Sequence, residues 1–345
     1  MARRPTRARP RPRPRKDHYE DNGPPILLWS TAAVLFILTA LPYLLGNALI
    51  ELEVLAAQPF LRLMLLVLAV AVAALAILRE EIPIAILPGL AALLIIGETF
   101  STMGTSPAAQ APPDRAGYLH IYTQNIGMES PEEFIGILAS GDFDIVLMQE
   151  AYVGHRKGWE VLAKQLGYHI YFQILRRDAG MGSLVMSKTP MQTLPSVRAR
   201  SWARQIRYFP RVRINYEEVP VDLYTVHLES LPLVQGGRVL FGSSKLRLQQ
   251  SEILAKEIAA TNHPVILGGD LNSTPIYRSN RPLRDLLNDA WTEAGFGFGY
   301  TYHASLPFAR IDAVLHKGFR TVSAEVVKVS NSDHRGLHVV LESIR

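Results

Sequence analysis

The residues of this sequence best suited to catalysis are polar residues that lie in or next to short apolar runs. In "ILGGDLNSTP", Ile266 to Pro275, a short apolar run ends in two glycines and is followed by a carboxylate, Asp270, and an amide, Asn272. Other apolar runs carry polar residues within them or beside their ends, namely Asn125, Glu150, His227, Asp312, Asp333 and His334. Loops at one edge of a rigid sheet are where polar groups converge without being buried and unpaired. These residues are therefore candidates for one site.

Together these residue types suit a hard divalent cation and a phosphate. Carboxylates, amides and histidines fit Mg²⁺, which keeps waters for phosphate, and Mn²⁺ is the alternative ion. The carboxylates would repel one another unless a cation and a protonated histidine offset their charge. Hydrolysis of a phosphate ester needs neutralised oxygens, an activated water and a stabilised leaving oxygen, and an Asp beside a His can supply the base. The chain has no cysteine, which excludes disulfides and thiolate metal sites.

Each residue taken alone also has a structural interpretation. The stretch from Asp270 to Ser273 fits a turn capped by an Asp or Asn side chain, and Asp333 fits the cap of a turn before the last strand. His227 could be a hydrogen-bonded core histidine, and Glu150 an ordinary surface acid. Their joint occurrence in this order favours a functional site. We expect the two glycines to allow a tight turn and Asp270 and Asn272 to alternate along an extended segment.

From Tyr118 onward the pattern is one of short strands alternating with amphipathic helices. Ser130, Pro131 and Glu133 predict a helix start with a capping box, and Lys245 to Ala260 predicts a long helix. Strands are predicted at "YLHIYTQN", "DIVLMQE", "VDLYTVHLES", "PVILGGD", "RIDAVLH" and "GLHVVLE". About 229 residues in this mix predict one large domain with sheets inside and helices outside.

Six fragments of this region occur in an order that resembles a known superfamily. They are "TQN", "LMQE", "VHLES", "GGDLNSTP", "RIDAVL" and "SDHRGL", spread over residues 118–342. The pattern resembles the endonuclease/exonuclease/phosphatase superfamily, which includes DNase I-like nucleases, AP endonucleases, neutral sphingomyelinases and inositol polyphosphate 5-phosphatases. The resemblance implies an α/β fold, a four-layer sandwich of two packed mixed β-sheets flanked by helices.

The resemblance also implies roles for the residues that match the motifs. Glu150 matches the principal Mg²⁺ ligand, Asn125 its neighbour in the metal and phosphate site, and Asp333 a residue that helps hold the metal or a second one. Among the catalytic residues, Asp270 matches the group that orients or deprotonates the attacking water, and Asn272 the holder of a phosphate oxygen. His334 matches the catalytic histidine, Asp312 its carboxylate partner, and His227 a second histidine. Which residue is the general base stays open.

The first hundred residues differ in composition from the rest. Residues 1–16 hold seven Arg and one Lys without an acid, and most of the net charge of +5 comes from them, so it says little about nucleic-acid binding by the folded domain. This tail cannot build a core, and it is either a solvated extension or a contact for anionic headgroups. Three apolar segments follow, at 26–46, 60–78 and 82–97. At about 1.5 Å per residue the first is long enough to span a bilayer and the third is the shortest.

These segments predict a membrane topology. The positive-inside rule places the tail in the cytoplasm, and three spans place everything after Gly97 outside. Arg62 can snorkel at the end of the second span. If the third segment does not span, the domain lies in the cytoplasm. We divide the chain into a basic disordered tail (1–21), a transmembrane region (22–100), a linker (101–116) and a catalytic domain (117–345).

The main hypothesis is a multi-pass protein of the bacterial plasma membrane whose catalytic domain is a Mg²⁺-dependent phosphodiesterase outside the cytoplasm. Its expected partners are a phosphate-ester substrate, with a lipid headgroup favoured by the tether, and membrane lipids, without an obligate protein partner. The alternatives are an extracytoplasmic nuclease acting on DNA and a non-catalytic receptor for phosphorylated ligands. An arginine-rich stretch, residues 197–214, is either a cationic wall for an anionic ligand or the solvated face of two strands.

Overall fold

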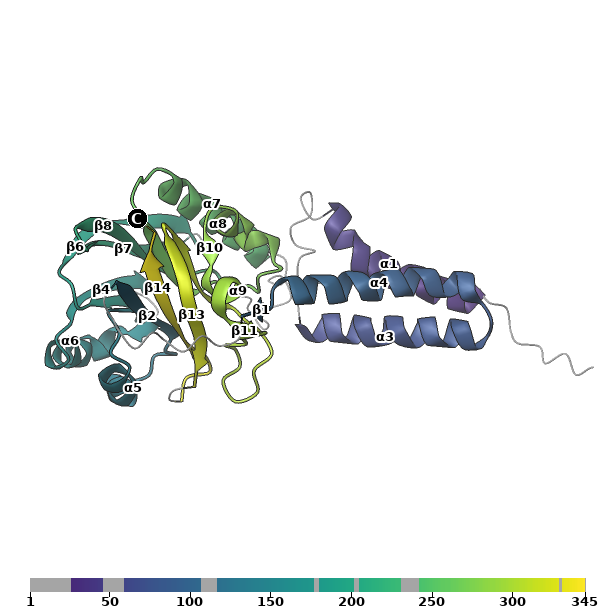
Figure 1. Ribbon diagram of the computed structural model, residues 1–345, viewed down its shortest axis with the longest axis horizontal. Helices are drawn as coiled ribbons and strands as arrows, with labels where there is room; N and C mark the ends of the chain where they lie inside the picture. Colours follow the sequence, from purple (N-terminus) through teal and green to yellow (C-terminus); the bar gives the residue numbers. More distant parts are fainter. Residues whose placement is uncertain are drawn as a thin grey trace, which may run out of the picture.

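The computed structural model describes residues 26–45, 59–106, 117–176, 180–201, 205–230, 242–328 and 331–344. The expected basic tail and residues 107–116 of the expected linker lie outside the described residues. Figure 1 shows a group of long helices that projects from a larger part built on β-sheets.

Two six-stranded mixed sheets form the larger part, which confirms the expected fold class. The first sheet has the order β10-β12-β9-β8-β7-β6 and consists of β10 (Asn288–Asp289), β12 (Asp312–Lys317), β9 (Val265–Asp270), β8 (Val219–His227), β7 (Ile206–Tyr216) and β6 (Met191–Arg200). The second has the order β13-β14-β2-β3-β5-β4 and consists of β13 (Phe319–Val327), β14 (Gly336–Ser343), β2 (Tyr118–Asn125), β3 (Ile145–Tyr152), β5 (Met181–Ser187) and β4 (His169–Arg176). The pairs β8–β9 and β2–β3 are parallel, and the other neighbouring pairs are antiparallel.

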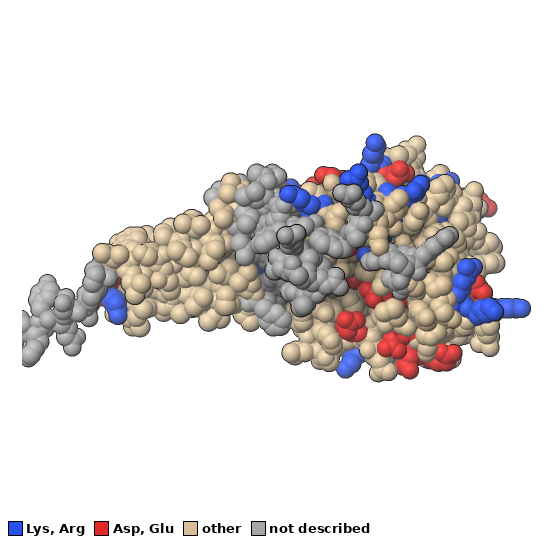
Figure 2. Space-filling view, turned by 180° about the vertical axis from the view of Figure 1, so that it is seen from behind, with Lys and Arg blue, Asp and Glu red and all other residues tan. Residues whose placement is uncertain are grey.

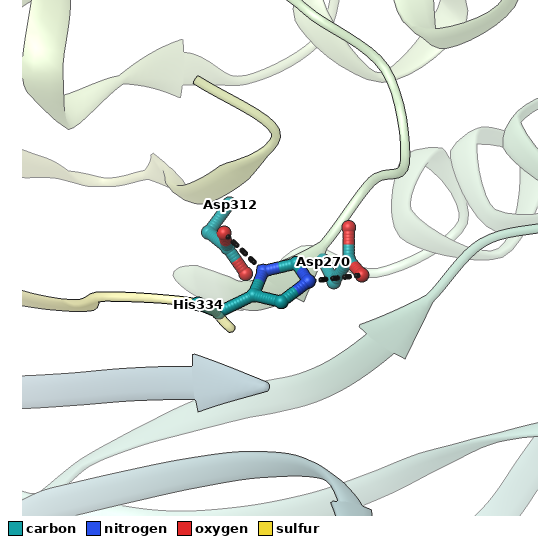
Figure 3. A group of neighbouring side chains, drawn as sticks. All are labelled: Asp270, Asp312 and His334. Carbon is teal, nitrogen blue, oxygen red and sulfur yellow. Dashed lines mark hydrogen bonds and ion pairs between the residues drawn. The ribbon is translucent and has the colours of Figure 1, made fainter. Parts of the chain in front are cut away.

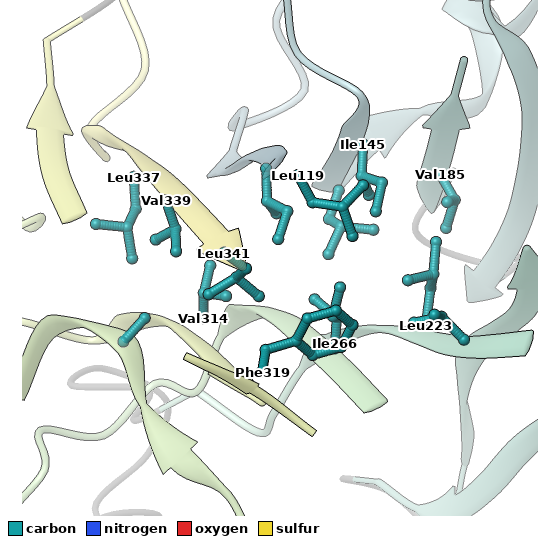
Figure 4. Close-up of a cluster of buried hydrophobic side chains, with 14 of the residues drawn as sticks. Leu119, Ile145, Val185, Leu223, Ile266, Val314, Phe319, Leu337, Val339 and Leu341 are labelled. Atoms are coloured by element: carbon teal, nitrogen blue, oxygen red, sulfur yellow. The ribbon is translucent and has the colours of Figure 1, made fainter. Parts of the chain in front are cut away.

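The four layers follow from the alternation of side chains along the strands. Leu119 of β2 and Ile266 of β9 lie in the core between the two sheets (Figure 4), and Ile121 of β2 belongs to the same core. Its neighbour Tyr122 points the other way, into a second core under α5 (Ile135–Ser140) and α6 (Arg156–Gln165). A third core lies between the first sheet and the helices α7 (Gly242–Ala259) and α8 (Arg281–Arg284).

The helix boundaries agree with the sequence in one place and differ in another. Helix α7 overlaps the long helix expected at Lys245 to Ala260, but it begins three residues earlier and ends one residue earlier. The expected capping box at Ser130 is wrong, because the Ser130 side chain makes no capping hydrogen bond and the segment starts as a 3₁₀ turn, Pro131–Phe134. Pro131 and Phe134 are both buried, and a 3₁₀ turn places residues three apart on one side.

In the described residues, three apolar helices form the projecting part: α1 (Ile26–Leu45), α3 (Pro59–Leu78) and α4 (Ile82–Ser101). By length and composition, two stretches could cross a membrane, Leu61–Leu78 and Ile82–Ser101, while Ile26–Leu41 is a shorter apolar helix. On the face shown in Figure 2 these helices carry almost no charged side chains except at the end far from the sheets. Because the apolar stretch of the first helix is shorter than those of the other two, the expected bundle of three spans stays a prediction.

An ion pair explains why α4 is longer than the apolar segment expected at 82–97. Arg62 does not snorkel outward, because its Nη1 lies 2.5 Å from Glu98 Oε2 and its Nη2 donates to the carbonyl of Ile95 at 2.8 Å. The pair offsets the charge of Glu98, and the helix continues to Ser101. The next residues are not a free linker either, because β1 (Gly104–Thr105) pairs with β11 (Phe296–Gly297) of the sheet part.

Candidate active site

Three of the expected site residues lie side by side at the end of the first sheet. Asp270 is the last residue of β9, and its register partners are His227 on β8 and Asp312 on β12. All three are almost completely buried. The parallel β8–β9 pair puts His227 and Asp270 at the same edge, and the antiparallel β12 begins there with Asp312. Strand order thus brings together residues that are far apart in the chain.

The two glycines before Asp270 have a different role from the tight turn that we expected. Both lie within β9, so the strand continues through them. A Cβ on Gly268 would lie 2.5 Å from Leu147 Cδ1 of the other sheet. Gly269 has a φ of +147°, and a Cβ there would lie 1.9 Å from the carbonyl oxygen of Val226. The glycines therefore permit close packing of the second sheet and of β8 against this strand.

Asn272 does not continue an extended segment, which corrects a second expectation. Its φ is +47°, and its backbone N–H donates to Asp270 Oδ1 at 2.7 Å. Its side-chain Nδ2 donates to Asp270 Oδ2 at 3.1 Å and to the Leu228 carbonyl at 3.0 Å. The Asp-capped turn considered as a structural alternative is present, and it holds the Asp270 carboxylate in place. Here the turn and the site use the same residues.

The second sheet contributes Asn125 and Glu150. Asn125 ends β2, and its Nδ2 lies 3.1 Å from both Glu150 Oε1 and Asp270 Oδ2. Glu150 has a φ of +55° and lies where the β3–β5 register shifts between Met148 and Ala151. Such bulges re-aim a side chain and are common beside active sites. The bulge brings the Glu150 carboxylate to the same amide that contacts Asp270.

His334 lies between two carboxylates (Figure 3). Its Nδ1 is 2.8 Å from Asp312 Oδ2, and its Nε2 is 3.8 Å from Asp270 Oδ2. The Gln124 side chain donates to the His334 carbonyl at 2.8 Å. Burial lowers the pKa of His334, but the charges of Asp312 and Asp270 outweigh it and raise that pKa to about 10. At neutral pH His334 is therefore an imidazolium held by Asp312.

His227 has the opposite protonation state. Burial, together with the charges of Arg207 and His334, lowers its pKa well below the ordinary value, so the ring is neutral at pH 7. Its Nε2 lies 3.4 Å from Glu150 Oε1 and 3.7 Å from Asp270 Oδ2. The two histidines thus differ, one cationic and one neutral, and this is the kind of pair that separates acid from base roles.

The carboxylates of the site carry more negative charge than the side chains around them offset. Burial raises the pKa of Asp270, His334 lowers it and Asp312 raises it, with the result at about 7. Among the described residues, Asp312 Oδ1 is buried without a hydrogen-bond partner. This donor set of carboxylates and an amide fits a hard divalent cation. Asp270, Asp312 and His334 have ligand atoms within 4.8 Å of one another. Glu150 and Asn125 approach Asp270 from the second sheet.

Asp333 lies at the rim, apart from the buried residues. Its side chain is exposed, and its backbone carbonyl accepts a hydrogen bond from Ala304 N at 2.7 Å. Its Oδ1 would be 3.7 Å from a Cβ built on Gly127. Asp333 thus lies across from the loop that follows Asn125, outside the group of Asp270, Asp312 and His334.

Sequence reasoning missed Tyr302. Its ring centroid lies 5.0 Å from that of His334, and its backbone forms a bridge with the same residue. The signal was weak, because Tyr302 comes from a stretch without a regular strand or helix pattern. The pairing becomes visible only when residues 301–309 fold beside the turn that carries His334.

Three arginines of the arginine-rich stretch lie on β7 and bond within the protein, while Arg198 and Arg200 on β6 are exposed. Arg207 is buried and donates to the carbonyls of His227 and Leu228, at 2.5 and 2.9 Å. Arg211 and Arg213 both bond to the buried Asp222. Residues 202–204 lie outside the described part. The described arginines of β7 therefore support the sheet rather than an anionic ligand.

Comparison with known proteins identifies the family to which this fold belongs. The sequence profile of the Endonuclease/Exonuclease/phosphatase family matches residues 122–334. The chain therefore belongs to this family, whose members hydrolyse phosphate esters with divalent metals. No curated protein matches the chain.

Solved structures support the same fold at low sequence identity. An endonuclease/exonuclease/phosphatase from Bacteroides vulgatus has a TM-score of 0.53 and 16% identity, covering 66% of this chain and 99% of its own. A mannosyl-6-phosphatase from Bacteroides thetaiotaomicron has a TM-score of 0.52 and 16% identity, covering 65% and 99%. Truncated TDP2 from Caenorhabditis elegans has a TM-score of 0.51 and 15% identity, covering 66% and 98%.

Proposed function

We propose that this protein is a membrane-anchored phosphodiesterase that uses Mg²⁺, or Mn²⁺ in its place, to hydrolyse the phosphodiester of a membrane lipid. The observation that carries the proposal is the buried Asp270 carboxylate, which shares the Asn125 amide with Glu150 while His334 approaches from the other side. Negative charge that the protein leaves unmatched in a buried site is suited to a cation and its phosphate ligand.

In this proposal Glu150, Asn125 and Asp270 hold the ion, and Asp333 approaches from the rim. The bound ion would neutralise charge on the phosphate oxygens. Asp270 orients or deprotonates the attacking water, because its carboxylate is held at the centre of the site by Asn125 and Asn272. His334, oriented by Asp312, presents an imidazolium to the phosphate and can protonate the leaving oxygen. Asn272 holds Asp270 through its backbone N–H and its side-chain amide.

The proposed location is the bacterial plasma membrane, with the catalytic domain outside the cytoplasm. Helices α3 and α4 supply the apolar length, and the turn between them lies at the end far from the sheets (Figure 1). A basic tail that remains in the cytoplasm and three spans would give this topology. A reporter fused at Gly117 tests it, and activity of the reporter only in the cytoplasm would reverse the assignment.

The activity is tested with the full-length protein in detergent micelles. We expect turnover of bis-p-nitrophenyl phosphate and of a phospholipid with Mg²⁺, and loss of both on chelation. The nuclease alternative predicts DNA cleavage, with affinity that falls steeply as salt rises. The receptor alternative predicts binding of phosphorylated ligands without turnover. Absence of turnover on lipids, nucleotides, DNA and inositol phosphates with either ion would reject the enzymatic proposal.

A further inference from the structure

A cavity of about 330 Å³ lies at the junction between the long helices and the sheet part. Leu63 and Leu66 of α3 and Ile95 of α4 line one side of it. Ile276 and Phe308, from loops of the sheet part, line the other. Its volume falls within the range of about 300–1,000 Å³ that is usual for ligand pockets. None of the residues of the candidate active site lines this junction pocket, so it is a separate space.

The junction pocket is nevertheless next to the active site. Thr274 and Pro275, which line it, come directly after the turn that holds Asp270 and Asn272. On its other side the Phe308 ring packs against Tyr302 at 5.5 Å between centroids, and Tyr302 packs against His334 at 5.0 Å. One aromatic side chain therefore separates the wall of the pocket from the catalytic histidine.

The chemistry of the lining favours an apolar occupant. Two arginines reach the pocket, and both are already matched by acids. Arg62 pairs with Glu98, and Arg310 pairs with Asp289 while its Nη2 donates to the Thr102 carbonyl at 3.0 Å. A second phosphate would find little positive charge there, whereas a hydrocarbon chain meets leucine, isoleucine, proline and phenylalanine side chains.

The position of the pocket indicates where that chain comes from. Leu63 and Phe298 line the pocket and are also 58% and 41% exposed, so the lining is continuous with the outer surface of the helices and the sheet part. Phe100, Phe296 and Leu306, with exposures of 61%, 68% and 73%, come from α4, β11 and the loop that carries Tyr302. Apolar side chains this exposed are typical of membrane contact. These three residues lie within two positions of the lining residues Thr99, Phe298 and Pro307, so the surface beside the pocket is suited to contact a bilayer.

We propose that the junction pocket holds an acyl chain of the lipid substrate while its phosphodiester lies against His334 and Asp270. The proposal rests on the proposed function, and it explains how a tethered enzyme selects a lipid from the bilayer beside it. Tyr302 then separates the apolar half of the substrate from the reacting half.

Chain-length dependence tests this proposal. Each methylene moved from water into an apolar pocket raises affinity about fourfold, since it contributes roughly 0.8 kcal/mol. In the full-length protein in nanodiscs, kcat/KM for short-chain phospholipids should rise with acyl length, relative to kcat/KM for bis-p-nitrophenyl phosphate, which has no acyl chain. Leu66→Trp fills the pocket from α3 and should lower that ratio by about tenfold or more for the longer chains.

Two further variants keep the test decisive. Ile276→Trp fills the pocket from the sheet part and should lower the ratio in the same way, even if Leu66→Trp disturbs the helices. Leu68→Trp is the matched control, because Leu68 is exposed on the same helix two residues away and does not line the pocket. It should keep the wild-type ratio. Equal chain-length dependence in all four proteins would overturn the proposal.

A binding readout separates this proposal from the proposed function. A phospholipid with a photoreactive group in its acyl chain should label residues 274–276 or 298–308 in the wild type and not in Leu66→Trp. If wild type hydrolyses neither ester, the proposed function fails, and the labelling still reports on the pocket. Labelling without any effect of chain length on turnover would identify a structural lipid and would contradict the substrate role.

Discussion

Two largely buried groups of charged side chains lie in the first sheet, one on β10 and one at the end of β9 with β12 between them, and they balance their charges differently. On β10, Asp289 Oδ2 accepts a hydrogen bond from Arg310 Nη1 at 2.8 Å, and Asp289 also forms an ion pair with Arg284. Burial raises the pKa of Asp289, but the two arginines outweigh it and hold that pKa well below its usual range. At the end of β9, Asp270 is fully buried, and among the described residues His334 is the cationic side chain that lowers its pKa, which nevertheless rises to about 7.

The difference separates a structural group from a functional one. In the Asp289 group each carboxylate oxygen is satisfied by an arginine, so the group has no capacity left for a ligand. In the Asp270 group two carboxylates share one imidazolium, with Glu150 close by, and negative charge is left over. Burial alone therefore does not indicate function. A buried charge that lacks its counter-charge does.

The largest expected effect is on catalysis. Asp270→Asn should lower kcat for phosphodiester hydrolysis by about 10²–10⁴-fold, the range for loss of a positioned acid or base. It should also raise Tm in metal-free buffer at pH 8, because a carboxyl whose pKa is raised destabilises the fold once it ionises. Asp285→Asn is the control, since Asp285 is 66% exposed in an ion pair with Arg281. Retained activity in Asp270→Asn would show that the Asp270 group is not the functional one of the two.

The next effect is on stability. Asp289→Asn leaves Arg310 buried without its full counter-charge, and removing one partner of such a pair costs about 3–5 kcal/mol. The free energy of unfolding in the sheet part, followed by tryptophan fluorescence, should fall by this amount at pH 7. Trp291 is a suitable reporter because its backbone N–H bonds to Asp289 Oδ1 at 3.0 Å. A loss below 1 kcal/mol would show that Asp289 is not needed to balance the charge of Arg310.

The stability difference should depend on pH in a defined direction. The pKa of Asp289 is depressed, so its contribution is present above the unfolded pKa of about 3.9 and is lost as pH falls below it. The gap in unfolding free energy between wild type and Asp289→Asn should be constant from about pH 7 to 5 and should shrink towards pH 2. A gap that stays constant over the acidic range would contradict the assigned cause.

The smallest expected effect is stabilisation by a metal ion. At an Mg²⁺ concentration about 100 times its Kd, binding should add about 2.7 kcal/mol to the free energy of unfolding. Glu150→Gln should lose most of this gain, and Asp289→Asn should keep it, because only the first variant removes a ligand. Thermal unfolding with Mg²⁺ and with chelator measures both. An equal gain in Glu150→Gln would place the ion elsewhere.

Much of this architecture could be predicted from residue patterns. The strands that carry Asn125, Glu150 and Asp270 were expected from their apolar runs, and they lie where those runs are. The buried bulge at Glu150 could not be foreseen, because only pairing with β5 reveals the register shift. Nor could the burial of Arg62, which depends on Glu98, 36 residues away, lying on a neighbouring helix.

The sequence by itself determined which residues could do the chemistry, because residue type sets charge and hydrogen-bonding capacity, and it determined the strands that end at them, because side-chain alternation is local. Only the tertiary structure decided which carboxylates stay unmatched. Asp270 and Asp289 are the same residue type, both lie at the ends of strands of one sheet, and both side chains are at most 10% exposed. They differ because, among the described residues, chain packing brings two arginines next to Asp289 and none next to Asp270. Coulomb energy depends on the distance between the charges, and residue positions in the sequence do not give that distance.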